Sequence, residues 1–212
     1  MSHQLDELFT HGDASAVEQY LYEHPDFDVN ATLGSWKGRP LIWACCNKNS
    51  AVVSLMLRHP SIDVNVRGYA DHSPFFAACA TKRVEPGCLL LADRRVDLNL
   101  PDWNGCTPLW AACRHGHLDI IRRMMLSGRE IDWEKKGKKH HYGREFTPLE
   151  IARDHPYAED PLTRNAEVVS LLERFRSDPT LTRQQILREM ELVHLLPDEP
   201  EKSGFFGGNS LL

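Results

Sequence analysis

The sequence has little that points to a membrane or a secretory route. No apolar run approaches the length of a membrane span, and the first residues have neither the basic region nor the apolar stretch of a signal peptide. The net charge is only −5, so bulk charge gives no reason to expect nucleic acid or a membrane surface as the main partner. We expect an intracellular protein, cytoplasmic, with nuclear entry left open.

Signatures of catalysis are also missing: there are no paired carboxylates, no Gly-rich phosphate loop and no nucleophile elbow. Cys106, His115 and His117 suggest a thiol–imidazole or metal site, but about 8 residues of helix separate the first two, or roughly 12 Å. A nucleophile and its base must come within ~3 Å, and zinc ligands lie ~2.0–2.3 Å from the ion. We expect no enzymatic activity, no cofactor and no metal.

Two short phrases recur with one period. Segment 73–79, SPFFAAC, returns 34 residues later at 107–113 as TPLWAAC, and Asp-Val-Asn or Asp-Leu-Asn stands at 28–30, 63–65 and 97–99. A fixed period indicates a stacked array. Ser73 or Thr107 can cap a helix whose first residue is Pro, and Gly116 suits the end of that helix. Each unit is therefore predicted to be two short antiparallel helices and a turn.

This unit resembles the ankyrin repeat, most closely over residues 105–121, GCTPLWAACRHGHLDII. The resemblance implies an all-α solenoid of about five helix-turn-helix units, at about 3–33, 34–67, 68–101, 102–136 and 143–176. Departures from the family pattern include Arg39 in place of the capping Thr, and Lys48, Lys82 and Pro156 in place of the Gly between the helices. We expect an array less regular and less stable than a consensus one.

Cys45, Cys79 and Cys113 recur at 34-residue intervals, where the repeat needs a small apolar side chain. Packed helices lie roughly 8–10 Å apart, whereas a disulfide needs Cα atoms within about 7 Å. We expect a buried column of reduced thiols.

Proteins of this family typically bind other proteins through the turn tips and the exposed side of the first helices, so the resemblance implies a protein-binding adaptor whose partner it does not name. Aromatic and Arg or His residues, which are typical interface anchors, occur at these positions. The alternative is that Trp36 and Trp103 fold back over the turns. The candidate partner-binding residues are Trp36, Asn47, Tyr69, His72, Trp103, Asn104, Cys106, Arg114, His115, Phe146 and Asp154.

Six extra residues between the fourth and fifth units coincide with a basic run at 135–144. We call it the basic finger; its cationic residues are Lys135, Lys136, Lys138, Lys139, His140, His141 and Arg144. One interpretation is a solvated loop kept extended by like charges. The other is a contact for an acidic protein surface, a phosphate or nucleic acid, or a nuclear-import patch.

Asn65 and Asn99 allow a second hypothesis. Their spacing from Leu57 and Leu91 matches the pattern that asparaginyl hydroxylases recognise in ankyrin repeats, which would make the protein a regulatory substrate. The alternative is that Asp and Asn hold the turn through side-chain hydrogen bonds.

The C-terminal segment shows a helical pattern at 177–197, with a capping-box match at Thr182 and Gln185. We expect this helix to cap the array, with an exposed partner-binding helix as the alternative. Residues 198–212 have no periodicity and are expected to be disordered.

Overall fold

The computed structural model describes residues 2–11, 13–33, 38–47, 49–139, 143–154 and 164–190. The elements in chain order are α1 (Ser2–His11), α2 (Ala14–Glu23), α3 (Pro40–Cys46), α4 (Ser50–Leu57), the 3₁₀ turn η1 (Tyr69–Asp71), α5 (Pro74–Ala80), α6 (Val84–Ala92), α7 (Pro108–Arg114), α8 (Leu118–Leu126), β1 (Gly137–Lys138), β2 (Glu145–Phe146), α9 (Pro148–Arg153), α10 (Arg164–Ser177) and α11 (Pro179–Glu189). The predicted all-α repeat solenoid is confirmed.

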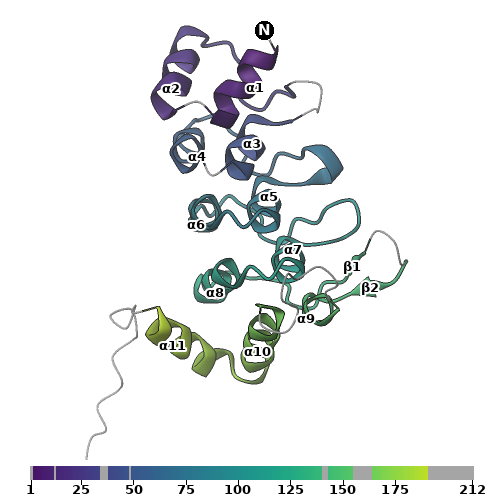
Figure 1. Cartoon of the computed structure of the whole chain (residues 1–212). Coiled ribbons are helices and arrows are strands. Elements are labelled where there is room, and N and C mark those ends of the chain that lie inside the picture. The colour runs from purple at the N-terminus through teal and green to yellow at the C-terminus, as the bar shows by residue number, and fades with distance from the viewer. Residues whose placement is uncertain are drawn as a thin grey trace, which may run out of the picture.

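The helices form two columns (Figure 1). The first helices of the units, α1, α3, α5, α7 and α9, contact one another in that order, and the second helices α2, α4, α6 and α8 form the neighbouring column. The turns between units project from the first-helix column, on the right of Figure 1, and β1 pairs with β2 antiparallel on the same side. Every turn therefore lies beside the turn of the next unit. No described helix is long and apolar enough to cross a membrane.

Side-chain caps and proline start the first helices of the later units. Ser73 and Thr107 accept hydrogen bonds from backbone N–H groups three residues on, and Thr147 forms a complete capping box with Glu150. Arg39 makes no such cap. Its guanidinium instead donates hydrogen bonds to the carbonyl oxygens of Asn30 and Arg67, which lie in the turns on either side. The residue that departs from the family pattern therefore connects neighbouring units.

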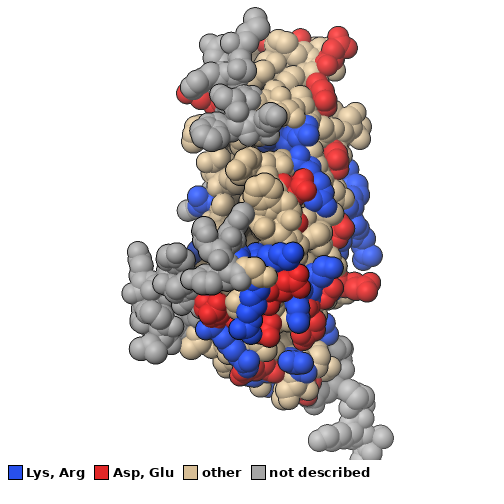
Figure 2. Space-filling model, turned by 90° about the vertical axis from the view of Figure 1, so that its right-hand side faces the viewer, with Lys and Arg blue, Asp and Glu red and all other residues tan. Residues whose placement is uncertain are grey.

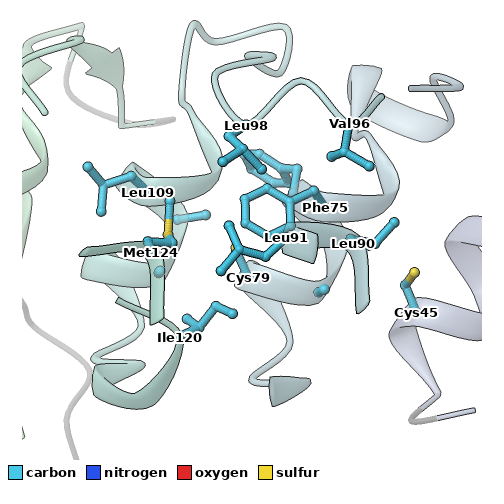
Figure 3. Packing of buried hydrophobic residues seen from close by; sticks show 14 of the residues in the cluster. Cys45, Phe75, Cys79, Leu90, Leu91, Val96, Leu98, Leu109, Ile120 and Met124 are labelled. Atoms are coloured by element: carbon cyan, nitrogen blue, oxygen red, sulfur yellow. The ribbon is translucent and has the colours of Figure 1, made fainter. Parts of the chain in front are cut away.

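The core is a continuous apolar layer between the two columns. Cys45, Cys79 and Cys113 are buried, and all six cysteines are free thiols. Burial raises the pKa of these three thiols, so they behave as small apolar side chains. Figure 3 shows Phe75 of the third unit in this layer, close to Leu91 of the same unit.

The turns are joined by an asparagine bridge at each of three positions. Asn65 donates from Nδ2 to the carbonyl of Arg95 (2.9 Å), and its Oδ1 accepts the N–H of Asp97 (2.8 Å). Asn30 and Asn99 make the same pair of bonds to the unit that follows each of them. A single amide thus satisfies a donor and an acceptor of the next backbone turn.

The C-terminal end differs in detail from the sequence prediction. The cap of α11 is Asp178, whose carboxylate accepts the N–H of Leu181, with Pro179 as the first helical residue. The predicted capping box at Thr182 is wrong: Thr182 is buried inside the helix, and its hydroxyl donates to the carbonyl of Asp178. An Asp-Pro pair starts a helix well because Pro needs no N–H partner at that position.

α11 lies against α8 and α10. Arg183 donates to the carbonyl of Met125, and Arg122 pairs with Glu189 at 2.9 Å. These contacts favour a capping role over an exposed partner-binding helix. The remainder of the predicted helix, to residue 197, and the tail 198–212 lie outside the described residues.

We expect Asn65→Ala to lower the free energy of unfolding by about 1–2 kcal/mol, because it leaves one N–H and one C=O of the next turn without their partner. Urea denaturation would measure the loss. Asn47→Ala is the matched control, since the Asn47 amide donates to the carbonyl of Trp43 in its own helix and, among the described residues, bridges to no other unit. An equal loss in both variants would contradict a bridge between units.

Candidate functional site

A pocket of about 430 Å³ opens between the turns of the third and fourth units. We call it the aromatic pocket. Its walls come from η1 and the residues after it, from α5, from the turn before α7, from α7 itself and from β1. The lining residues are Tyr69, Ala70, His72, Phe76, Ala80, Asp102, Trp103, Asn104, Cys106, Trp110, Ala111, Arg114, His115 and Lys138.

Tyr69 and Trp103 stand at the mouth of the aromatic pocket. They are 72% and 58% exposed, and their ring centroids lie 6.2 Å apart at an interplanar angle of 52°. The N–H of Trp103 donates to the carbonyl of Ala70 at 3.2 Å, so the two turns that carry the rings are joined. Among the described residues, only four large apolar side chains are strongly exposed, and two of them meet here. This exposure favours the interpretation of Trp103 as an anchor over the alternative that it folds back over the turns.

The turn that carries Tyr69 is strained. Ala70 and Asp71 have φ of 56° and 61°, and the left-handed region costs a residue with a side chain roughly 1–2 kcal/mol. Hydrogen bonds from Asp71 to Gly68 and from Gly68 to His72 hold the turn closed. A turn maintained at such a cost, next to an exposed aromatic pair, has the character of a binding site.

His72 and Asp102 lie in the floor of the aromatic pocket. The His72 ring stacks on Phe76 with centroids 4.3 Å apart, and its Nε2 is 4.0 Å from the Asp102 carboxylate. Asp102 also accepts the N–H groups of Asn104 and Cys106, which fixes the turn below Trp103. Burial lowers the pKa of His72, while the Asp102 charge acts in the opposite direction.

Arg114 and His115 form the wall supplied by the end of α7. The Arg114 guanidinium lies 5.7 Å from the centroid of the Trp110 ring, a cation–π contact. The exposed His115 ring stacks on His117, whose Nδ1 is 2.6 Å from the carbonyl oxygen of Cys79. His117 therefore bridges two units. Within the described residues, no group of three His, Cys, Asp or Glu side chains could hold a metal ion.

Two of the predicted surface residues are buried, and their prediction as exposed anchors is wrong. Cys106 is 3% and Phe146 6% exposed. The β1–β2 pair folds over Cys106, so that a Cβ on Gly137 would lie 2.6 Å from the Cys106 sulfur. The Phe146 carbonyl accepts the indole N–H of Trp110 at 2.9 Å. Apart from Gly137, nothing in the sequence indicated that Cys106 and Phe146 would be buried, because the pairing of β1 with β2 depends on the tertiary fold.

Two more predicted residues, Asn47 and Asp154, lie apart from the aromatic pocket. Asn47 is exposed at the end of α3. Asp154 is exposed, and its carboxylate forms a salt bridge with the Lys139 ammonium at 3.3 Å. Trp36 lies outside the described residues.

The basic finger contains β1, which pairs with β2 just after the finger to form a short hairpin, and its described cations divide into two groups. Lys139 is buried against Asp154, and the Arg144 guanidinium lies 5.1 Å from the centroid of the Phe146 ring. Lys135, Lys136 and Lys138 are exposed. His140 and His141 lie outside the described residues.

The three exposed lysines line a second pocket of about 400 Å³, which we call the lysine pocket. Its remaining walls are Trp103, Asn104, Gly105 and Glu145. Figure 2 shows the turn-tip side of the molecule, where side chains of both charges gather in the lower half and tan surface lies above them. The lysine pocket itself has three cations and one carboxylate.

Asn65 and Asn99, the two candidate hydroxylation sites, lie in the asparagine bridges, away from both pockets. Their amides are occupied by bonds to the next unit. The structure therefore gives both residues a role in holding the turns.

We expect the imidazole of His72 to titrate below its ordinary pKa of 6.5 because burial disfavours the charged form. The unfolded chain then binds a proton more readily, so the stability contributed by His72 is present above about pH 6.5 and is lost as pH falls through the folded-state pKa. An NMR titration would give the pKa directly. The free energy of unfolding of His72→Gln should fall less than that of wild type on acidification. A measured His72 pKa above 6.5 would contradict the expected effect of burial.

Comparisons with known proteins agree with the architecture. The ankyrin repeat family model matches residues 39–69 and 104–136, which cover much of the second and fourth units. No curated protein matches the chain. Most of the third unit lies outside both matches. It has the strained η1 turn and Lys82 at φ 58°, whereas Gly116 at φ 65° follows the first helix of the fourth unit. Two matches to the repeat, in a stack of paired helices joined by turns, show that the chain is an ankyrin-repeat protein.

Proposed function

We propose that this protein is an adaptor that binds a partner protein through its turn-tip surface, centred on the aromatic pocket. Ankyrin repeats are generally protein–protein interaction modules without catalytic activity of their own. The observation that carries the proposal is the exposed pair of Tyr69 and Trp103 above a pocket of about 430 Å³. Large rigid aromatic side chains at a pocket are the usual anchors of protein interfaces.

The neighbouring side chains support this location. Arg114 over Trp110 and His72 over Phe76 give polar groups fixed by ring contacts, so little side-chain entropy remains to be lost on binding. The strained turn at Ala70 and Asp71 maintains the position of Tyr69. A preformed surface of this kind binds with a smaller ordering cost than a mobile loop.

An intracellular location is part of the same proposal, cytoplasmic with access to the nucleus left open. It is supported by the six cysteines, all of which are free thiols. Extracellular proteins commonly use cysteines as disulfides, whereas intracellular thiols remain reduced.

Modification of Asn65 and Asn99 by a hydroxylase stays a prediction and is the alternative function. The bridging hydrogen bonds of both amides require a turn to open before an enzyme could reach them. If the role of these residues is structural alone, mass spectrometry of the protein from its native source should find no added oxygen on either of them. An added oxygen mapped to either residue would support the substrate function.

The adaptor function is tested by affinity capture from the native source with a Tyr69→Ala, Trp103→Ala double variant. We expect the partner to be identified with wild type and its affinity for the variant to fall by about 10- to 100-fold, the loss typical of removing central anchors.

Tyr22→Ala is the matched control, because Tyr22 is also strongly exposed but lies in α2 of the first unit. Circular dichroism would establish that both variants are folded. A partner retained equally by the double variant would place binding elsewhere on the molecule.

A further inference from the structure

We propose that the aromatic pocket and the lysine pocket form one binding site for a linear acidic segment of a partner protein. An apolar or aromatic side chain of that segment occupies the aromatic pocket, and Asp or Glu side chains next to it meet Lys135, Lys136 and Lys138. This inference rests on the proposed function, and it adds the chemistry of the partner.

The two pockets are adjacent and share part of their lining. Trp103, Asn104 and Lys138 line both of them, and the N–H of Lys138 donates to the carbonyl of Asn104 at 2.9 Å. The hairpin is thus attached to the turn that carries Trp103, and the indole is a wall common to the two pockets. A segment that passes across Trp103 reaches both.

The charge of the lysine pocket is not neutralised from within. Lys138 is 3.9 Å from Glu145, whereas Lys135 and Lys136 form no salt bridge within the part of the chain that the structure describes. The Glu150 carboxylate, which accepts the N–H of Thr147 at 2.8 Å, interacts electrostatically with Lys136 but does not line the lysine pocket. Three lysines against one carboxylate leave a site that attracts anionic side chains.

Two other cations of the basic finger, Lys139 and Arg144, have contacts elsewhere and do not line the lysine pocket. Lys139 pairs with Asp154, and Arg144 covers the Phe146 ring. These two stabilise the hairpin, while the remaining lysines face the pocket. This segment therefore holds Lys135, Lys136 and Lys138 next to Trp103.

An acidic peptide fits this site better than nucleic acid does. The chain has a net charge of −5, and the turn-tip side has acidic as well as basic side chains in its lower half (Figure 2). A polyanion with a charge at every step would meet those carboxylates too. A short segment with a few carboxylates meets only the lysines.

The geometry also limits the spacing in the partner. An extended chain advances about 3.3 Å per residue. Because a single indole separates the two pockets, we expect the acidic residues within about two to four positions of the apolar anchor.

The test is selection of a random 12-residue peptide library on the full chain, in four forms: wild type, Trp103→Ala, a triple variant K135Q/K136Q/K138Q, and the control triple variant R58Q/R94Q/R188Q. The control removes the same charge from exposed positions on or next to the second-helix column and α11. Circular dichroism would establish folding of each form.

We expect wild type and the control triple variant to enrich peptides that combine an aromatic or apolar residue with nearby Asp or Glu. The lysine triple variant should enrich the anchor without the acidic residues, and Trp103→Ala should enrich neither. For one selected peptide, Kd should rise at least tenfold on the lysine triple variant. Replacing its Glu by Gln should weaken binding to wild type similarly, with little further loss on the lysine triple variant.

The outcomes separate this inference from the proposed function. If the selected peptides depend on Trp103 but are not enriched in Asp or Glu, the inference of an acidic partner segment is overturned, and the proposed function is not. Absence of any Trp103-dependent peptide would overturn both. A single-stranded oligonucleotide that binds more tightly than the selected peptides, with loss on the lysine triple variant, would overturn the peptide in favour of nucleic acid.

Discussion

The stack depends on the hydrogen bonds that each turn makes with the next. One asparagine amide per turn satisfies an N–H and a C=O of the following unit, so the units are held at one spacing and with one orientation of their turns. Apolar burial between the helix columns supplies most of the favourable free energy, but it is not directional. The bridges provide the direction, and they bring the turn that carries Tyr69 next to the turn that carries Trp103.

The binding surface arises where the repeat departs from regularity. Ala70 and Asp71 adopt left-handed conformations in the turn of the third unit, and the family model does not match the residues of this unit after Tyr69. The hairpin is inserted between the fourth and fifth units and closes over Cys106. Regular units supply a rigid frame, and these two irregular segments give one part of it a distinct shape and charge.

The sequence predicted the parts of the fold that repeat. Pro108 after a capping Thr107 predicts a helix start from local chemistry alone, and the period places Cys113 over Cys79. The burial of Cys106 and Phe146 could not be predicted from the sequence, because it depends on how a hairpin of only two residues per strand packs onto a neighbouring turn. A sign was present in Gly137, since only a residue without a side chain can lie so close to Cys106.

The division of the basic finger explains how a run of like charges contributes specificity. A uniformly solvated loop would present its cations in many arrangements and would attract any anion weakly. Here Lys139 is paired with Asp154, Arg144 lies against Phe146, and β1 is bonded to the turn before α7. These contacts restrict the remaining lysines to one place, beside an exposed indole. An apolar anchor and a cluster of cations at a set separation recognise a pattern in a partner, which neither could do alone.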